Sequence, residues 1–182
     1  PAPPTSTATP TSTATPNRVN LIADGGCGEA GAAYPTPAAY WIENSNDGWP
    51  IVDTSAKRTG DYGAFLCGDN DDADSLKQLV SVPGNTPAAA VSLYFWVESN
   101  DSATFEHDFL RFKITTPSGV PQYSVEITNN TSYPSGAWRV WNSIDLSNFS
   151  GQSIYLEFSC TTDAQYGTAF YLDDITFMAT VP

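Results

Sequence analysis

The sequence is poor in basic side chains and in reactive ones. Its 182 residues contain 7 Lys and Arg against 20 Asp and Glu, a net charge of −13, with one His, one Met and three Cys. A surface this acidic repels phosphate backbones and anionic lipids, so we expect neither nucleic acid nor a membrane as a partner. The single histidine, His107, has no recognisable nucleophile partner, and we expect no enzymatic activity. Cations, neutral glycans and other protein surfaces remain open as partners.

Long apolar runs and helical periodicity are also missing. No stretch approaches the roughly 20 apolar residues that a membrane-spanning helix needs. Gly, Pro, Asn, Ser and Thr are abundant, and aromatic residues make up 13% of the chain. This composition is typical of an all-β domain with many turns, rather than a helical one.

The N-terminal segment repeats the hexapeptide TSTATP and lacks the apolar surface needed to fold alone. Read as an extended strand, it has one threonine face and one face of small residues and prolines. At about 3.1 Å per residue, its first sixteen residues span roughly 50 Å. We place an arm at residues 1–18 and a single domain at residues 19–182. The arm residues singled out are Thr5, Thr7, Thr9, Pro10, Thr11, Thr13, Thr15 and Pro16.

Two interpretations of this arm stay open. It is either a spacer, with sugars attached to its threonine face, or an arm that docks on a neighbouring copy. Addition of an extended segment to a sheet edge is a known recognition mode. A head-to-tail contact of this kind propagates into a fibre unless it closes into a ring.

The body shows short alternating runs separated by turn residues, the pattern of a sandwich or barrel. Between the first two runs lies a long aromatic loop, and an acidic turn covers residues 68–74. Runs of this number and length predict a two-sheet antiparallel β-sandwich of the jelly-roll type. The expected strands are Val19–Ala23, Asp61–Cys67, Leu76–Val82, Ala89–Glu98, Phe109–Thr115, Tyr123–Thr128, Trp138–Leu146, Ile154–Cys160 and Phe170–Met178.

The body also resembles secreted bacterial jelly-roll modules related to carbohydrate-binding modules and MAM-like domains. Six segments carry this resemblance, in the expected order: NLIADGG at 20–26, GDYGA at 60–64, DSLKQ at 74–78, LYFW at 93–96, DLSNFSGQ at 145–152 and FYLDDITF at 170–177. The resemblance covers about residues 19–178. It implies a sandwich fold and leaves sugar binding, adhesion and scaffolding open as functions.

In such modules the aspartate at the position of Asp173 commonly helps to hold a structural calcium. In a regular strand Asp173 shares a face with Tyr171, Ile175 and Phe177, so it points inward. The resemblance implies Asp173, Glu29 and Asp24 as calcium ligands, with a satisfied buried carboxylate as the alternative. The chain departs from the usual Phe-Glu after Gly-Gly, because Cys27 and Gly28 stand there and Glu29 follows one place late.

The four carboxylates Asp69, Asp71, Asp72 and Asp74 could also gather a cation. They do not follow the spacing of a calcium loop, since the twelfth position is Val80 rather than Glu. We therefore interpret this segment as a solvated acidic turn.

Aromatic side chains are the candidates for contacts with a glycan or another protein. Trp138 and Trp141 differ in parity, so both cannot face inward in a regular strand. The candidates are Tyr40, Trp41, Trp49, Trp138 and Trp141.

The cysteines fit an exported chain with one disulfide and one spare thiol. The resemblance places Cys27 near Cys67 and favours that pair, whereas Cys160 falls on an inward face and is interpreted as a small buried hydrophobe. The chain begins at Pro1 without Met, which we interpret as a processed, secreted product or an excised module. We therefore expect an extracellular or cell-surface location.

Two functional hypotheses follow. The first is a structural subunit that self-associates into a filament or surface assembly, with the arm docked on the next copy. The alternative is a carbohydrate-binding module tethered by a linker to a secreted enzyme or surface protein, with a polysaccharide as its partner.

Overall fold

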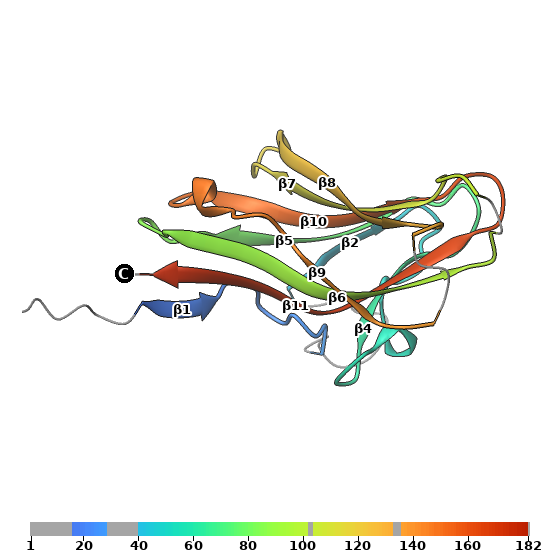
Figure 1. The fold of residues 1–182 in the computed structure, drawn as a ribbon, viewed down its shortest axis with the longest axis horizontal. Coiled ribbons are helices and arrows are strands. Elements are labelled where there is room, and N and C mark those ends of the chain that lie inside the picture. Colours follow the sequence, from blue (N-terminus) through green and yellow to red (C-terminus); the bar gives the residue numbers. More distant parts are fainter. Residues whose placement is uncertain (1–15, 29–39, 102–103, 133–135, 182) are drawn as a thin grey trace, which may run out of the picture.

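A computed structural model describes residues 16–28, 40–101, 104–132 and 136–181 of the chain. Two antiparallel sheets face each other in this part of the protein (Figure 1). The first sheet has the order β3 (Val52–Asp53), β4 (Gly63–Cys67), β11 (Thr168–Val181), β6 (Ala88–Ser99) and β9 (Arg139–Asn142), and β1 (Asn17–Asn20) also pairs with β11. The second has the order β2 (Ile42–Ser45), β5 (Asp74–Ser81), β10 (Ser153–Thr161), β7 (Phe109–Thr115) and β8 (Pro121–Asn129).

The expected all-β sandwich is confirmed, and each strand expected from the sequence is present. β7 has the expected bounds, Phe109–Thr115, and the other strands have shifted ends. The first strand begins at Asn17, two residues before the expected Val19, because Asn17 and Arg18 pair with Val181 and Thr180. The short strands β2 and β3 were not expected, since they lie within the aromatic loop. Strands of 4 and 2 residues are too short to show an alternating pattern.

The core lies between the two sheets and follows the alternation of the long strands. In β10 and β6, every second side chain is buried over most of the length. Phe112 lies at its centre, with the ring of Phe158 at 5.4 Å and that of Trp141 also at 5.4 Å, centroid to centroid. Burial of one such ring stabilises the fold by roughly 2–3 kcal/mol.

Strand β11 contains a bulge that swaps its two faces. Asp174 has a φ of 51°, and the pairing with β6 shifts register between Asp173 and Thr176. Asp173 is fully buried as expected, and it shares a face with Tyr171, since the two pair with Tyr94 and Trp96 of β6. Ile175 and Phe177, which follow the bulge, lie on the opposite, core-facing side and do not share that face. The ring of Tyr171 packs on Phe65, and its hydroxyl donates a hydrogen bond to Glu98 at 2.9 Å. Period-two reasoning fails here because the extra residue breaks the alternation.

The disulfide joins Cys67 at the end of β4 to Cys160 in β10, with 6.2 Å between their Cα atoms. The expected Cys27–Cys67 pair is therefore wrong, and so is the interpretation of Cys160 as an isolated hydrophobe. Both bonded cysteines end inward-facing runs of opposite sheets, where the two layers meet. Cys27 is a buried free thiol, and burial together with the carboxylates of Asp24 and Asp173 raises its pKa. An intramolecular disulfide is typical of exported proteins.

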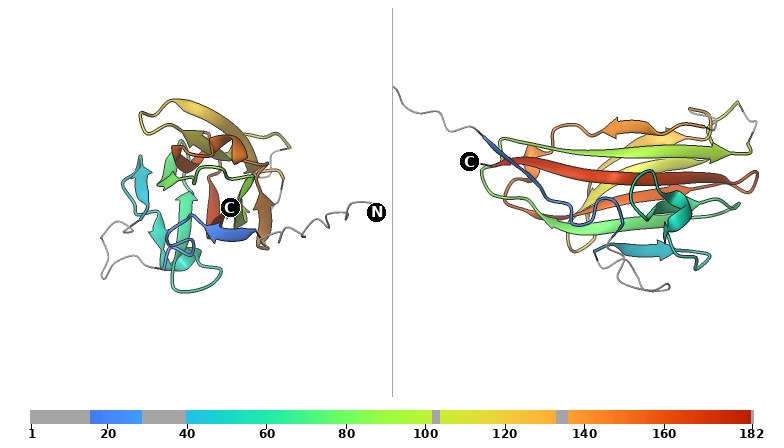
Figure 2. Two further views of the ribbon diagram at one scale, coloured as in Figure 1. Left: turned by 90° about the vertical axis from the view of Figure 1, so that its left-hand side faces the viewer. Right: turned by 90° about the horizontal axis from the view of Figure 1, so that it is seen from below.

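The two ends of the sandwich differ. Strand β1 runs antiparallel to the last residues of β11, so both lie at the end that carries the C-terminus (Figures 1 and 2). The β4–β5, β6–β7 and β10–β11 connections lie at the opposite end, here called the loop end. Pro16 is exposed directly before β1, whereas the predicted arm residues Thr5 to Thr15 lie outside the described residues.

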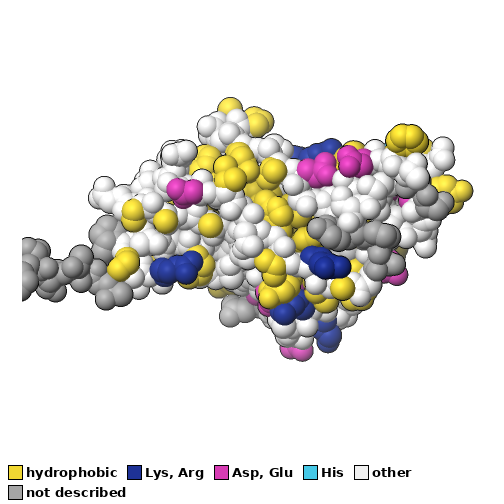
Figure 3. All heavy atoms as spheres, viewed as in Figure 1, with side chains coloured by type: hydrophobic (Ala, Val, Ile, Leu, Met, Phe, Trp, Pro, Cys, Tyr) yellow, Lys and Arg dark blue, Asp and Glu magenta, His cyan; other side chains and the backbone are white. Residues whose placement is uncertain are grey.

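One open edge of the sandwich is apolar. Figure 3 shows a band of apolar side chains crossing the molecule over β8 and β9, the outermost strands on this side. Half-buried side chains of these strands, Tyr123, Val125, Ile127 and Trp141, pack against the core. In the described part of the chain, no helix is long and apolar enough to cross a bilayer.

Candidate binding site at the loop end

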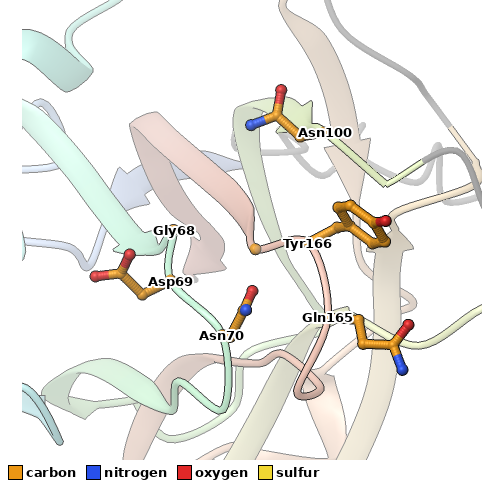
Figure 4. A pocket seen from close by; sticks show the side chains of 7 residues that line it. Gly68, Asp69, Asn70, Asn100, Gln165 and Tyr166 are labelled. Carbon is orange, nitrogen blue, oxygen red and sulfur yellow. The ribbon is translucent and has the colours of Figure 1, made fainter.

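The loop end carries an open pocket of about 590 Å³. The β4–β5 turn supplies one wall, the β10–β11 turn supplies the facing wall, and Asn100 follows β6 (Figure 4). Tyr166 is 60% exposed, so its ring faces solvent at the rim. The pocket is lined by Gly68, Asp69, Asn70, Asn100, Gln165, Tyr166 and Gly167. It therefore combines one exposed aromatic ring with amide and carboxylate groups.

Backbone contacts fix the two turns against each other. The Asp71 N–H donates to the Asp163 carbonyl at 2.7 Å, and the Thr162 hydroxyl donates to the Asp69 carbonyl at 2.7 Å. The turns approach so closely at Gly167 that an added Cβ would lie 2.3 Å from the Gly68 carbonyl oxygen. Only glycine fits this position, and the walls of the pocket are consequently preformed.

A second, smaller hollow of about 170 Å³ shares Gly68 and Asp69 with the pocket. Three carboxylates line it, those of Asp47, Asp69 and Asp74, and the exposed ring of Trp49 stands beside them. The side chain of Asp47 accepts a hydrogen bond from the Trp49 N–H at 2.8 Å, so the β2–β3 turn presents both groups together. We call this the acidic hollow.

Two aspartates at the acidic hollow are buried with incomplete hydrogen bonding. Asp72 is 4% exposed and Asp74 is 7% exposed. One oxygen of each accepts a backbone N–H, from Ala73 and from Cys67, both at 2.7 Å. The other oxygens, Asp72 Oδ2 and Asp74 Oδ1, are buried without a hydrogen-bond partner. The interpretation of this turn as merely solvated is therefore wrong for these two residues.

Burial and mutual repulsion change the ionisation of these groups. Burial, and then the Asp74 charge, raises the pKa of Asp72 to about 6. Burial also raises the pKa of Asp74, while the hydrogen bond from the Cys67 N–H and the nearby donor groups of Ser45 and Asn46 act in the opposite direction. Ser45 and Asn46 thus lie close to the Asp74 carboxyl, but neither supplies the missing partner of Oδ1.

The structure separates the five aromatic candidates. Trp49 is 69% exposed and Tyr40 is also exposed, so both remain available for binding. Trp41 is 2% exposed, packs on Phe158 and donates a hydrogen bond to the Asp24 carbonyl, so its expected surface role is wrong.

The two later tryptophans lie on opposite faces, as their parity requires. Trp141 faces the core, where it packs on Phe112. Trp138 packs edge-on against Trp96 with 5.9 Å between the ring centroids. Both are partly buried, so neither offers a whole ring face to a ligand.

The expected calcium ligand Asp173 is already fully hydrogen-bonded. Its Oδ2 accepts the N–H groups of Arg58 and Thr59 at 2.6 and 2.8 Å, and its Oδ1 accepts that of Asp174 at 2.6 Å. Burial nevertheless raises the pKa of Asp173. Three backbone donors compensate this carboxylate, which fits the alternative of a satisfied buried carboxylate.

The two remaining calcium candidates give a mixed fit. Asp24 Oδ2 is buried without a partner and lies close enough to Cys27 to affect its pKa, together with Asp173. Glu29 lies outside the described residues. Calcium between Asp24, Glu29 and Asp173 therefore stays a prediction.

Apart from Asp69, sequence reasoning missed the residues of the open pocket. Tyr166, Gln165 and Asn100 were not candidates, because they lie in turns far apart in the chain. One signal was available in principle: an aromatic residue followed by glycine between two strong strands marks an exposed turn.

Comparisons with known proteins support the fold. No family model and no curated protein sequence matches the chain. Among solved structures, it is similar to the carbohydrate-binding module TmCBM61, solved with β-1,4-galactotriose, at a TM-score of 0.57 and 17% identity over 87% of this chain and 97% of that one. The structural neighbours include further carbohydrate-binding modules, so the resemblance drawn from the sequence is confirmed.

Two other neighbours have similar coverage. One is the K2 cleaved adhesin domain of Lys-gingipain, at a TM-score of 0.52 and 17% identity over 91% of this chain and all 100% of that one. Another is the CBM22-1 xylan-binding domain of Xyn10C from Paenibacillus barcinonensis. Its TM-score is 0.50 and its sequence identity 15%, over 93% of this chain and 99% of that one. At these identities the likeness shows a shared β-sandwich fold alone.

Proposed function

We propose that this chain is a non-catalytic, extracellular module that binds a neutral polysaccharide through the open pocket at its loop end. The observation that carries this proposal is the exposed ring of Tyr166 beside the amide side chains of Asn70, Asn100 and Gln165 in one preformed pocket. Aromatic rings stack on the apolar faces of sugars, and amides both donate to and accept from sugar hydroxyl groups.

The shape and charge of the site narrow the ligand class. The pocket is open rather than enclosed, which suits a polymer that passes through it better than a small molecule that must be buried. Asp69 lines it, and the whole chain carries a charge of −13. Acidic polysaccharides would be repelled, so a neutral chain is the ligand.

The arrangement of the ends supports a tethered module. The chain enters the domain at Pro16 and β1, at the end opposite the pocket. A linker attached there leaves the loop end free to meet its ligand. The similar fold of carbohydrate-binding modules favours this function over a filament subunit.

Affinity electrophoresis and calorimetry with soluble β-1,4-galactan and xylan test the proposal. The variant Tyr166→Asn removes the ring, and Asn tolerates the positive φ of 57° at this position. We expect its affinity for the bound polysaccharide to fall about tenfold or more. Phe105→Ala is the matched control, because Phe105 is 72% exposed but lines neither hollow. Equal binding by Tyr166→Asn and the parent would contradict the proposed site.

Self-assembly is the second candidate function, and one observation favours it. Strand β1 pairs with β11 alone among the described strands, so its other edge is open directly after the predicted arm. Open strand edges accept further strands. Electron microscopy of the chain with and without residues 1–16 tests it: filaments that vanish on deletion support assembly, whereas single particles from both samples exclude it.

A further inference from the structure

The acidic hollow next to the pocket has the properties of a cation site. Asp47 reaches it from the β2–β3 turn, while Asp69 and Asp74 reach it from the β4–β5 turn. No Lys, Arg or His among the described residues forms an ion pair with them. The hollow therefore concentrates negative charge from two separate turns without a positive partner from the protein.

The buried oxygens supply the second, independent observation. Asp74 lines the hollow, is more than nine-tenths buried, and leaves Oδ1 without a hydrogen-bond partner. Asp72, buried beside it, leaves Oδ2 unpartnered as well. A buried carboxylate oxygen without a donor is costly, because it gives up its hydration and receives nothing in return. A cation in the hollow would remove that cost.

Oxygen ligands on loops select the kind of ion. Carboxylate oxygens are hard ligands, and thiolate is absent here because Cys67 and Cys160 are joined in the disulfide. Magnesium demands a near-ideal octahedron, whereas calcium accepts six to eight oxygens in flexible geometry. We propose that the acidic hollow binds one calcium ion, held by the carboxylates of Asp47, Asp69 and Asp74 with Asp72 beside them.

Binding requires a small rearrangement of the exposed ligands. Among the described residues, the only group of three or more ligand-type residues whose atoms already lie within 4.8 Å of one another is Cys67, Asp74 and Cys160. Asp47 and Asp69 are exposed, so a rotation of each side chain can bring a carboxylate oxygen toward Asp74. For Asp47 this rotation exchanges the hydrogen bonds that its Oδ1 accepts from the Ser45 hydroxyl and the Trp49 backbone N–H for contact with the ion. Asp74 is the fixed ligand, and the other two close on the ion.

This site differs in position from the expected calcium ligands Asp24, Glu29 and Asp173. It also does not depend on the proposed glycan binding, because it rests on different side chains apart from Asp69.

The test is isothermal titration calorimetry. Calcium is titrated into the full, disulfide-intact chain after a chelator has removed any bound metal. We expect saturable binding with a dissociation constant of about 10⁻⁵–10⁻³ M. Asp69→Asn and Asp74→Asn should each weaken it about tenfold or more, because each removes one charged ligand. Terbium, a luminescent substitute for calcium, should be sensitised through Trp49, and Trp49→Phe should lower that emission.

Asp71→Asn is the matched control for charge. Asp71 lies in the same turn, is exposed, lines neither hollow, and has a φ of 55°, which Asn tolerates. The affinity of Asp71→Asn for calcium should stay within about twofold of that of the parent, since screening in salt solution weakens the effect of charges that do not touch the ion. Asp69→Asn keeps the test valid if Asp74→Asn does not fold. Asp24→Asn reports separately on the other predicted site.

Absence of saturable calcium binding in the parent would overturn the proposal. So would binding that Asp69→Asn and Asp74→Asn leave unchanged while Asp24→Asn abolishes it. Two bound ions in the parent and one in Asp69→Asn would support it.

Discussion

Two buried aspartates of this protein, Asp173 and Asp74, meet opposite surroundings. Asp173 lies at the bulge of β11, where three backbone N–H groups donate to its two oxygens. Asp74 begins β5, where one N–H satisfies one oxygen and the other is unpartnered. Burial raises the pKa of both. Burial alone therefore does not mark a cation site; the number of donors that reach the carboxylate separates the two cases.

Removal of the disulfide should lower the stability most. The bond fixes Cys67, whose backbone N–H donates to the Asp74 carboxylate. We expect the double variant Cys67→Ser/Cys160→Ser to lose about 3–5 kcal/mol of unfolding free energy, since the bond closes a loop across 93 residues. Urea denaturation measures this loss. Cys27→Ala is the control for removal of a buried sulfur and should cost about 1 kcal/mol. A loss below that of the control would show that the disulfide does not support this end.

Removal of the satisfied carboxylate should have the next largest effect. Asp173→Ala leaves the N–H groups of Arg58, Thr59 and Asp174 without their acceptor, and we expect a loss of about 2–4 kcal/mol. Chemical denaturation in a chelator isolates this structural role. Asp173→Asn, which keeps one acceptor oxygen, should lose less. A large loss that appears only when calcium is present would instead indicate a metal ligand.

The pH dependence tests the other side of the comparison. The pKa of Asp72 is about 6 in the folded protein against 3.8 for the free side chain, so between these values the folded state binds more protons. Without calcium, the unfolding free energy should therefore rise as the pH falls from 7 to 5. We expect a contribution of roughly 1 kcal/mol.

Asp72→Asn separates this contribution from the other buried carboxyls. The pKa values of Asp74, Asp108 and Asp173 are raised too. These three groups therefore change the unfolding free energy with pH in the same direction in the parent and in the variant. The difference in unfolding free energy between the parent and Asp72→Asn should shrink as the pH falls toward 5. A difference that does not change with pH would contradict the raised pKa.

The smallest effect is expected at the surface. Arg58 pairs with Asp174 beside the Asp173 site, and both side chains are about 30% exposed, at 31% and 29%. Asp174→Asn should lower stability by about 0.5 kcal/mol, because solvent screens an exposed pair. Repeating the denaturation in 1 M salt should abolish the difference. A loss as large as that of Asp173→Ala would mean that the two neighbouring carboxylates act as one unit.

Much of the sandwich was predictable because it depends on local pattern. Ile154, Leu156 and Phe158 alternate with polar residues, and the strand they predict is β10. The bulge at Asp174 was not predictable from alternation, since a single residue with positive φ reverses the faces on either side. Trp41 shows the same limit, because its burial depends on Phe158, which is distant in sequence.

The sequence by itself determined an all-β chain with a large excess of acidic residues, because alternation, composition and charge are local properties. Only the tertiary structure decided which cysteines bond, which aspartates are satisfied and which aromatic rings remain exposed. Each of those outcomes depends on groups from turns and strands far apart in the chain. Cys67 bonds to Cys160, and the turns that carry Asp69 and Tyr166 line one pocket, only after the two sheets pack together.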